Sequence, residues 1–295
     1  MRGMDLVRWE RHPALRRPLF VVAFEGWNDA GDASTIALDY LAQACKAERF
    51  ATIDCEEFYD FTVTRPHVRV TDGERHIDWP DIELLSGNLP GAGHDLVLVR
   101  GVEPQLRWKS FCEAVVSVAK AVGAELTLIL GALLADVPHT RPVRVSGTTD
   151  DRDLASRLGL AASSYEGPTG IVGVLHDALR REGVPAASFW AAVPHYVHQM
   201  PSPKAALALV ERSAAVLGAS VDPLELRVAA EEYERQVSER VADDDEAAAY
   251  VAELEDAEDS ETSESEDGAD RLRLGNIDEL AADVERFLRE HRGES

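Results

Sequence analysis

Residues 19–24 read Leu19-Phe20-Val21-Val22-Ala23-Phe24, a run of six apolar side chains. A run without polar alternation is typical of a strand that is buried on both faces, as in a parallel sheet covered by helices. A polar, glycine-containing loop follows at residues 25–32, and a helical pattern follows the loop over about residues 33–47. The order of buried strand, polar loop and helix indicates an α/β fold.

The same order continues along the chain to about Gly218. Further strands are predicted at residues 50–58, 95–100, 125–130, 142–146 and 188–193, and further helices at residues 107–122, 150–158, 169–182 and 203–217. Apolar strands that alternate with helices predict a mostly parallel sheet flanked by helices. Residues 68–77 differ, because Asp72-Gly73 favours a tight turn, and we expect a hairpin there as a local antiparallel addition.

The last quarter of the chain has helical patterns and a strong charge. One helix is predicted from Pro223, and a final amphipathic helix from Asn276, where Glu279 completes a capping box. An acidic tract at about residues 242–270 is expected to be a flexible connection and, less often, a docking site for a basic partner. The predicted organisation is an α/β core domain at residues 1–221 and a C-terminal helical appendage at residues 222–295.

The charge of the chain is unevenly distributed. The formal net charge is −24, and fourteen acidic residues without any Lys or Arg lie between Val241 and Asp270. Nucleic acid and anionic membranes are excluded as partners, because binding either one requires a basic surface. No apolar stretch approaches the ~18–20 residues that span a bilayer, and the N-terminus lacks a secretory apolar region. We expect a cytoplasmic protein, and abundant alanine with few lysines indicates a GC-rich bacterial genome.

Four polar segments follow predicted strands, where parallel α/β sheets place their ligand sites. The first segment is the loop at residues 25–32. Its carboxylates and the N–H groups at the start of the following helix could bind a polar group, or the loop could cap that helix with the indole of Trp27 packed over it as a lid. In the second, Glu103 could pair with Arg107, which is more often a structural pair. The candidate residues of these two segments are Glu25, Trp27, Asn28, Asp29, Asp32, Glu103, Arg107 and Trp108.

The third and fourth segments lie further along the chain. Tyr165, Glu166 and Thr169 precede a predicted helix and could hold an anion, although Gly170 and Gly173 also suit close packing of that helix on the sheet. His195 and His198 could ligate a metal, but a structural role is favoured because no HExxH motif or cysteine supports a metal site.

Searches for known catalytic motifs return nothing. The sequence has no GxSxG elbow, no GxxxxGK[ST] loop and no GxGxxG fingerprint. Cys45, Cys55 and Cys112 have no CxxC spacing and are expected to be buried, reduced thiols. We therefore predict no catalytic residue, no metal and no cofactor.

Several segments together resemble the bacterial branch of the proteasome-assembly-chaperone family. They are residues 24–32, Gly101-Val102-Glu103-Pro104 with Arg107-Trp108, residues 165–171, and Val193-Pro194-His195-Tyr196 with residues 201–205. The resemblance implies a nucleoside-phosphorylase-like α/β sandwich that forms homo-oligomers. Members from eukaryotes and archaea help proteasome α subunits to assemble. Some proteasome-binding proteins end in a hydrophobic residue, a tyrosine and one further residue, and insert this tail between α subunits. This sequence ends in His291-Arg292-Gly293-Glu294-Ser295. The resemblance therefore implies contact with a proteasome through another surface.

Two functional hypotheses follow. The first is a non-enzymatic, oligomeric interaction protein whose partners are itself and proteasome subunits, and it predicts that Trp27 and Trp108 lie on an exposed or intersubunit surface. The alternative is an enzyme or binder of a small polar ligand, a nucleotide or nucleoside, at the strand carboxyl-end rim. This alternative predicts a concave pocket lined by Glu25, Asn28, Asp29, Thr169 and His195.

Overall fold

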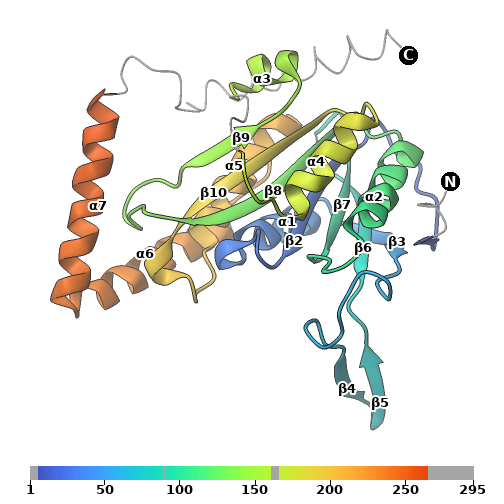
Figure 1. Cartoon of the computed structure of the whole chain (residues 1–295), viewed down its shortest axis with the longest axis horizontal. Coiled ribbons are helices and arrows are strands. Elements are labelled where there is room, and N and C mark those ends of the chain that lie inside the picture. The colour runs from blue at the N-terminus through green and yellow to red at the C-terminus, as the bar shows by residue number, and fades with distance from the viewer. Residues whose placement is uncertain (1–5, 90, 161–165, 265–295) are drawn as a thin grey trace.

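An eight-stranded sheet forms the centre of the computed structural model, which describes residues 6–89, 91–160 and 166–264 (Figure 1). The strand order is β1-β3-β6-β7-β2-β8-β10-β9. The four central strands, from β7 to β10, are parallel as predicted, and the strands toward both edges are antiparallel. The strand bounds are β1 Val7–Trp9, β2 Leu19–Glu25, β3 Glu48–Ile53, β6 Ile82–Asn88, β7 Asp95–Val102, β8 Leu126–Ala135, β9 Val145–Thr148 and β10 Ala186–Pro194.

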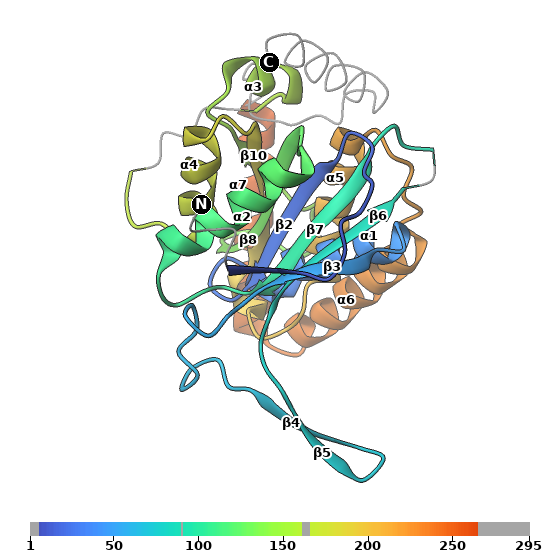
Figure 2. The same cartoon turned by 90° about the vertical axis from the view of Figure 1, so that its right-hand side faces the viewer.

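Strand β2 is buried on both faces, as its apolar run predicts. Leu19, Val21 and Ala23 pack in one hydrophobic cluster, together with side chains of α1 (Ala33–Ala44) and α5 (Pro203–Leu217). The alternate residues, such as Phe20, pack in a second cluster with α2 (Trp108–Val122) and α4 (Ile171–Arg181). The core therefore consists of two helical layers that enclose the sheet (Figure 2).

Local sequence signals explain several helix boundaries. Ser202 caps α5 and precedes a proline at the first helical position, and its hydroxyl accepts a hydrogen bond from the N–H of Ala205. Asp151 caps α3 (Arg152–Leu158), where its carboxylate accepts from the N–H groups of Asp153 and Leu154 at 2.9 and 3.0 Å. These short-range contacts are why the predicted helix starts agree with the structure to within a few residues.

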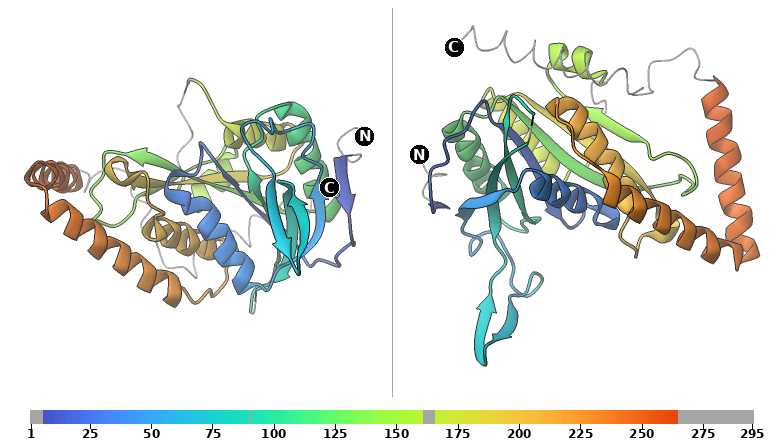
Figure 3. Two further views of the ribbon diagram at one scale, coloured as in Figure 1. Left: turned by 90° about the horizontal axis from the view of Figure 1, so that it is seen from below. Right: turned by 180° about the vertical axis from the view of Figure 1, so that it is seen from behind.

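The acidic tract differs from the prediction, because most of it is helical. Helix α6 (Leu224–Ala242) leads into α7 (Asp245–Glu264), which extends away from α6 at an angle (Figure 3). Arg141 lies 2.7 Å from Asp259, and Arg144 lies 2.9 Å from Glu258. Over residues 245–264 the expectation of a flexible connection is therefore wrong, because α7 docks on arginines of the β8–β9 loop. The final helix predicted from Asn276 lies outside the described residues.

The strands differ from prediction in four places. Strands β1 and β6 were not predicted, the strand expected to reach residue 58 ends at Ile53, and the strand expected at residues 142–146 begins at Val145. The predicted hairpin is present as β4 (His67–Thr71) and β5 (Glu74–Asp78), but it is a separate two-stranded sheet that projects from the body (Figure 1). No helix within the described ranges is both long and apolar enough to cross a membrane.

The aromatic packing under α2 provides a test of this fold. Phe111 is fully buried, and its ring makes edge contacts with Phe24 and Phe58 at centroid distances of 5.5 and 5.4 Å. We expect Phe111→Ala to lower the free energy of unfolding by about 3–5 kcal/mol, because a large cavity forms between the sheet and α2. Urea denaturation measures this loss, with Leu106→Ala at an exposed position as the control. A loss no larger than that of the control would contradict the packing.

Candidate functional site

Three of the four polar segments singled out in the sequence meet at the carboxyl-end edge of the parallel strands, and Ser202, which follows the fourth segment, joins them. The Asn28 amide nitrogen donates to Glu103 Oε1 at 3.0 Å, and the N–H of Ile171 donates to the same oxygen at 3.1 Å. The N–H of Ser202 donates to the carbonyl of Gly31 at 2.7 Å. We call this set of contacts the rim, and it confirms that the segments lie close together in space.

The loop after β2 is held tightly against the rim. The Asn28 carbonyl accepts from the N–H of Ala132 at 2.8 Å, and the Glu25 carbonyl accepts from the N–H of Glu103 at 2.8 Å. Gly31 has φ +59°, and a Cβ added to it would lie 2.9 Å from the Cβ of Ser202. A side chain at this position would be strained and would also push α5 away from the loop.

Asp29 acts as a cap for the start of α1. Its carboxylate accepts from the N–H and the hydroxyl of Ser34 at 2.6 and 2.7 Å, and from the hydroxyl of Thr35. Burial raises the pKa of Asp29, while these hydrogen bonds work in the opposite direction. Burial and the nearby Asp29 and Asp32 carboxylates also raise the pKa of Glu25. Asp29 therefore matches the capping alternative for this loop.

Glu103 has different partners from the one that its sequence suggests. It does not pair with Arg107, which forms an ion pair with Glu57 instead. Its carboxylate lies at the N-terminus of α4, where it accepts from Ile171 N–H and offsets the positive end of the helix dipole. The predicted Glu103–Arg107 pair is wrong because the long-range contacts of both residues replace a local one.

The two tryptophans of these segments differ in exposure. Trp27 is 76% exposed and is not packed as a lid. Trp108 is partly buried against the α2 core cluster, and its indole N–H donates to the carbonyl of Pro104 at 2.5 Å. The prediction of a surface indole is confirmed for Trp27, whereas Trp108 has a largely structural environment.

The segment before α4 packs closely on the rim, which favours the packing interpretation of this segment rather than an open anion site. A Cβ added to Gly170 would lie 2.5 Å from Asn28 Oδ1, so the helix start approaches the rim closely. Thr169 and Glu166 are exposed and do not join the Asn28–Glu103 contacts. Tyr165 lies outside the described residues.

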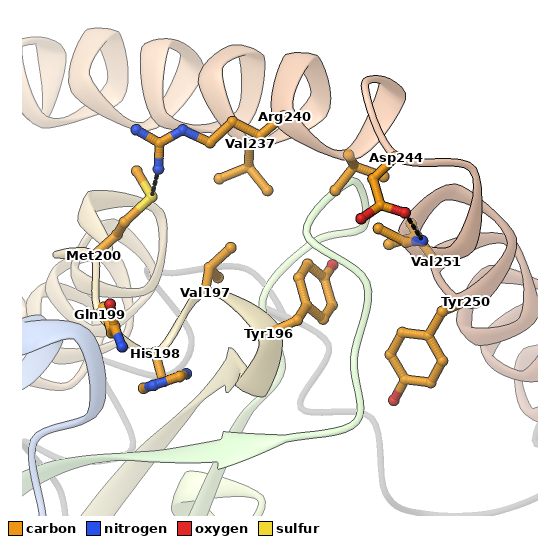
Figure 4. A pocket seen from close by; sticks show the side chains of 12 residues that line it. Tyr196, Val197, His198, Gln199, Met200, Val237, Arg240, Asp244, Tyr250 and Val251 are labelled. Atoms are coloured by element: carbon orange, nitrogen blue, oxygen red, sulfur yellow. Dashed lines mark hydrogen bonds between the residues drawn. The ribbon is translucent and has the colours of Figure 1, made fainter.

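His195 belongs to a separate aromatic cluster. Its Nδ1 lies 3.0 Å from Asp136, and its ring makes edge contacts with Tyr196 and Tyr250 at 5.8 and 5.6 Å. A pocket of about 490 Å³ lies beside this cluster, between the turn after β10 and the α6–α7 corner (Figure 4). Its lining comprises Tyr196, Val197, His198, Gln199, Met200, Val237, Arg240, Val241, Asp244, Ala247, Tyr250 and Val251. None of the five residues expected to line a single pocket is among them.

His139, which no sequence pattern singled out, links three elements. Its Nδ1 lies 2.9 Å from the Tyr196 hydroxyl, its Nε2 lies 2.9 Å from the Ser238 hydroxyl of α6, and Lys204 donates to its carbonyl. Burial, together with the nearby Lys204 charge, lowers the pKa of His139. No motif surrounds this histidine, so only the fold shows its role.

The three cysteines are buried, as expected. Burial raises the pKa of Cys45 to about 11, and it raises the pKa of Cys55 and that of Cys112 to about 12. At neutral pH all three thiols are protonated and therefore poor nucleophiles.

Comparison with known proteins gives a consistent result. The model described as PAC2 family matches residues 23–241. A PAC2 family protein from Streptomyces avermitilis is 50% identical, with TM-score 0.75 over 79% of this chain and 99% of its own. A proteasome-assembly chaperone homologue from Mycobacterium tuberculosis is 46% identical, with TM-score 0.73 and the same coverage. A second protein from that organism, of unknown function, is 29% identical, with TM-score 0.79 over 95% of this chain and 96% of its own. A search of curated proteins found no match.

The Glu103 contacts predict a stability effect. Glu103→Ala leaves the Ile171 N–H and the Asn28 amide without their acceptor, and we expect unfolding free energy to fall by about 1–3 kcal/mol. Glu103→Gln keeps an acceptor oxygen and should lose less. Urea denaturation tests both variants, with Glu113→Ala, an exposed carboxylate on α2, as the control. Equal stability of all three variants would show that the rim contacts contribute nothing.

The lowered pKa of His139 predicts a pH dependence. The folded state binds fewer protons at this residue than the unfolded chain, so its contribution to stability is present above the usual histidine pKa of about 6.5 and is lost as the pH falls. We expect the stability difference between the wild type and His139→Gln to shrink between about pH 7.5 and about pH 5. Denaturation at both pH values measures it. A constant difference would contradict the assignment, and His176, whose pKa is also lowered, is unchanged in both proteins.

Proposed function

The chain belongs to the PAC2 family, and from this premise we propose that it is a non-enzymatic, homo-oligomeric interaction protein that acts on proteasome subunits. The observation that carries the proposal is the 46% identity to a proteasome-assembly chaperone homologue, over 79% of this chain. The family match includes the whole rim, from Asn28 to Ser202, and the adjacent Trp27.

The geometry of the rim supports protein contact over catalysis. Trp27 is held outward on a loop that is fixed by backbone hydrogen bonds, so it loses little freedom when a partner binds. Tryptophan is one of the residue types enriched among the few residues that carry most of the binding energy at interfaces. The protonated thiols also argue against cysteine chemistry.

We also propose a fold family, a C-terminal appendage and a cellular compartment for this protein. The two helical layers around a sheet with a parallel centre support a nucleoside-phosphorylase-like sandwich, and α6 with α7 supports a helical appendage that begins near residue 222. The compartment in this proposal is the bacterial cytoplasm.

The alternative is a binder of a nucleotide or nucleoside at the rim. It is favoured by Asn28, a residue that is 2% exposed and whose Oδ1 has no hydrogen-bond partner among the described residues. A buried acceptor without a partner suits a ligand donor such as an exocyclic amine. Against this alternative, Glu103 already occupies the start of α4, and His195 lies in a different cluster.

Affinity purification from the native host tests the leading proposal. The tagged full chain should recover proteasome subunits by mass spectrometry, and Trp27→Ala should reduce that recovery at least ~10-fold if the indole is a hot spot. Leu224→Ala, at an exposed apolar position on α6, is the matched control and should recover as much as the wild type. Absence of proteasome subunits from the wild-type sample would overturn the proposal.

Thermal denaturation tests the alternative with nucleotides and nucleosides as probes. A ligand at the rim should raise the melting temperature of the wild type in a concentration-dependent way and should not raise that of Asn28→Ala. An equal rise in both proteins would place the ligand elsewhere, and no rise at high ligand concentration would remove the alternative.

A further inference from the structure

A two-stranded arm, residues 65–79, projects from the carboxyl-end edge of the sheet (Figures 1 and 3). Every residue of β4 is exposed, and β5 is exposed except at Asp78, which is partly buried. The arm pairs with no other strand of the described residues, so within that part of the chain both of its outer edges are unpaired. A hairpin of this kind has little stability in water without a surface to pack on.

One face of the arm carries three apolar side chains and one arginine. In the register of the hairpin, Val68 lies opposite Ile77, and Val70 lies opposite Arg75. Opposite residues in an antiparallel pair point to the same face, so Val68, Val70 and Ile77 share one side of the arm with Arg75. They are 53%, 53% and 67% exposed for Val68, Ile77 and Val70, and the nearby Trp79 is 57% exposed. The other face carries alternating polar residues.

The segment that leads into the arm is attached to the body. The carbonyl of Phe58 accepts from the N–H groups of Gln105 and Leu106 at 3.0 Å each, and the ring of Phe61 makes an edge contact with Trp79 at 5.0 Å. Trp79, at the end of the arm, therefore packs on a segment that is itself hydrogen-bonded to the body.

The charge of the arm is unlike that of the rest of the chain. Residues 65–79 contain three arginines and three acidic residues, so the arm is formally neutral, and the remaining residues carry the full −24. Arg69 is paired with Asp78 within the arm, at 2.6 Å, whereas Arg75 lies on the same face as Val70 and Ile77. Two acidic bodies repel each other, but a neutral arm with an arginine on its contact face can approach an acidic surface without that cost. The acidic surface that the structure supplies is the body of another copy.

The size of the arm also favours another copy. Strands of five residues are about 17 Å long, so the face of one arm is smaller than the ~800 Å² that each partner buries in a stable complex. In a symmetric dimer two such contacts form, because each copy places its arm on the body of the other and receives the other's arm on its own body. Reciprocal contacts of this kind are typical of closed symmetric oligomers.

We propose that the arm is the self-association element of this protein, and that its apolar face packs on the acidic body of a second copy. The inference rests on the homo-oligomer proposed above and assigns the surface that forms it. In the proposed contact Trp79, Val70 and Ile77 are covered by the second copy, and the opposite face of the arm lies at the edge of the interface.

The mass of the full chain in solution, measured by light scattering over a range of concentrations, tests the proposal. The wild type should be oligomeric, and Ile77→Asp should weaken association at least tenfold because it puts a charge in the apolar contact. His76→Asp is the matched control: it adds the same charge at the adjacent exposed residue on the opposite face, and it should assemble like the wild type. Circular dichroism confirms that both variants are folded.

The outcomes separate this inference from the proposed function. An oligomeric wild type with an equally oligomeric Ile77→Asp would overturn the role of the arm and leave the oligomer intact. A monomeric wild type at every concentration would overturn both. A photo-crosslinking residue in place of Trp79, in a mixture of ¹⁴N- and ¹⁵N-labelled chains, should give mixed-isotope crosslinks to the body. Crosslinks only within one chain would also overturn the proposal.

Discussion

The burial of β2 on both faces is the constraint from which the rest of the architecture follows. Its peptide groups have no access to water, so they require strands on both sides, and β7 and β8 provide them in parallel. Its side chains alternate between two faces, so each face requires its own helical layer. Because the central strands share one direction, their carboxyl ends meet at one edge, and the rim forms there.

Local patterns made the core of this fold predictable, and long-range contacts limited the prediction. The apolar run of β2 and the cap at Ser202 act over a few residues, so the sequence shows them directly. Strand β6 was missed because a short run with Ser86 and Gly87 acquires its burial only from β3 and β7. The acidic helix α7 was misread for a similar reason, since its arginine partners lie more than a hundred residues earlier.

The candidate site shows the same division. The strand-end rule correctly predicted that the loops containing Asn28 and Glu103 come together. It could not predict that Glu103 caps α4, because spacing favoured a helical pair with Arg107 and gave no sign of Glu57. The apolar side chains of the arm alternate visibly within the predicted hairpin, but only the structure shows that they are exposed, with no element of residues 6–89, 91–160 and 166–264 over them.

The central position of β2 also has a consequence for biosynthesis. This strand leaves the ribosome well before its two neighbours, which begin only at Asp95 and Leu126. At ordinary translation rates β2 therefore waits on the order of ten seconds before both pairing strands exist. During that interval an entirely apolar segment is exposed in the nascent chain, as an open target for holdases and for aggregation. The strand that organises the folded molecule is thus its most vulnerable part while the protein is being made.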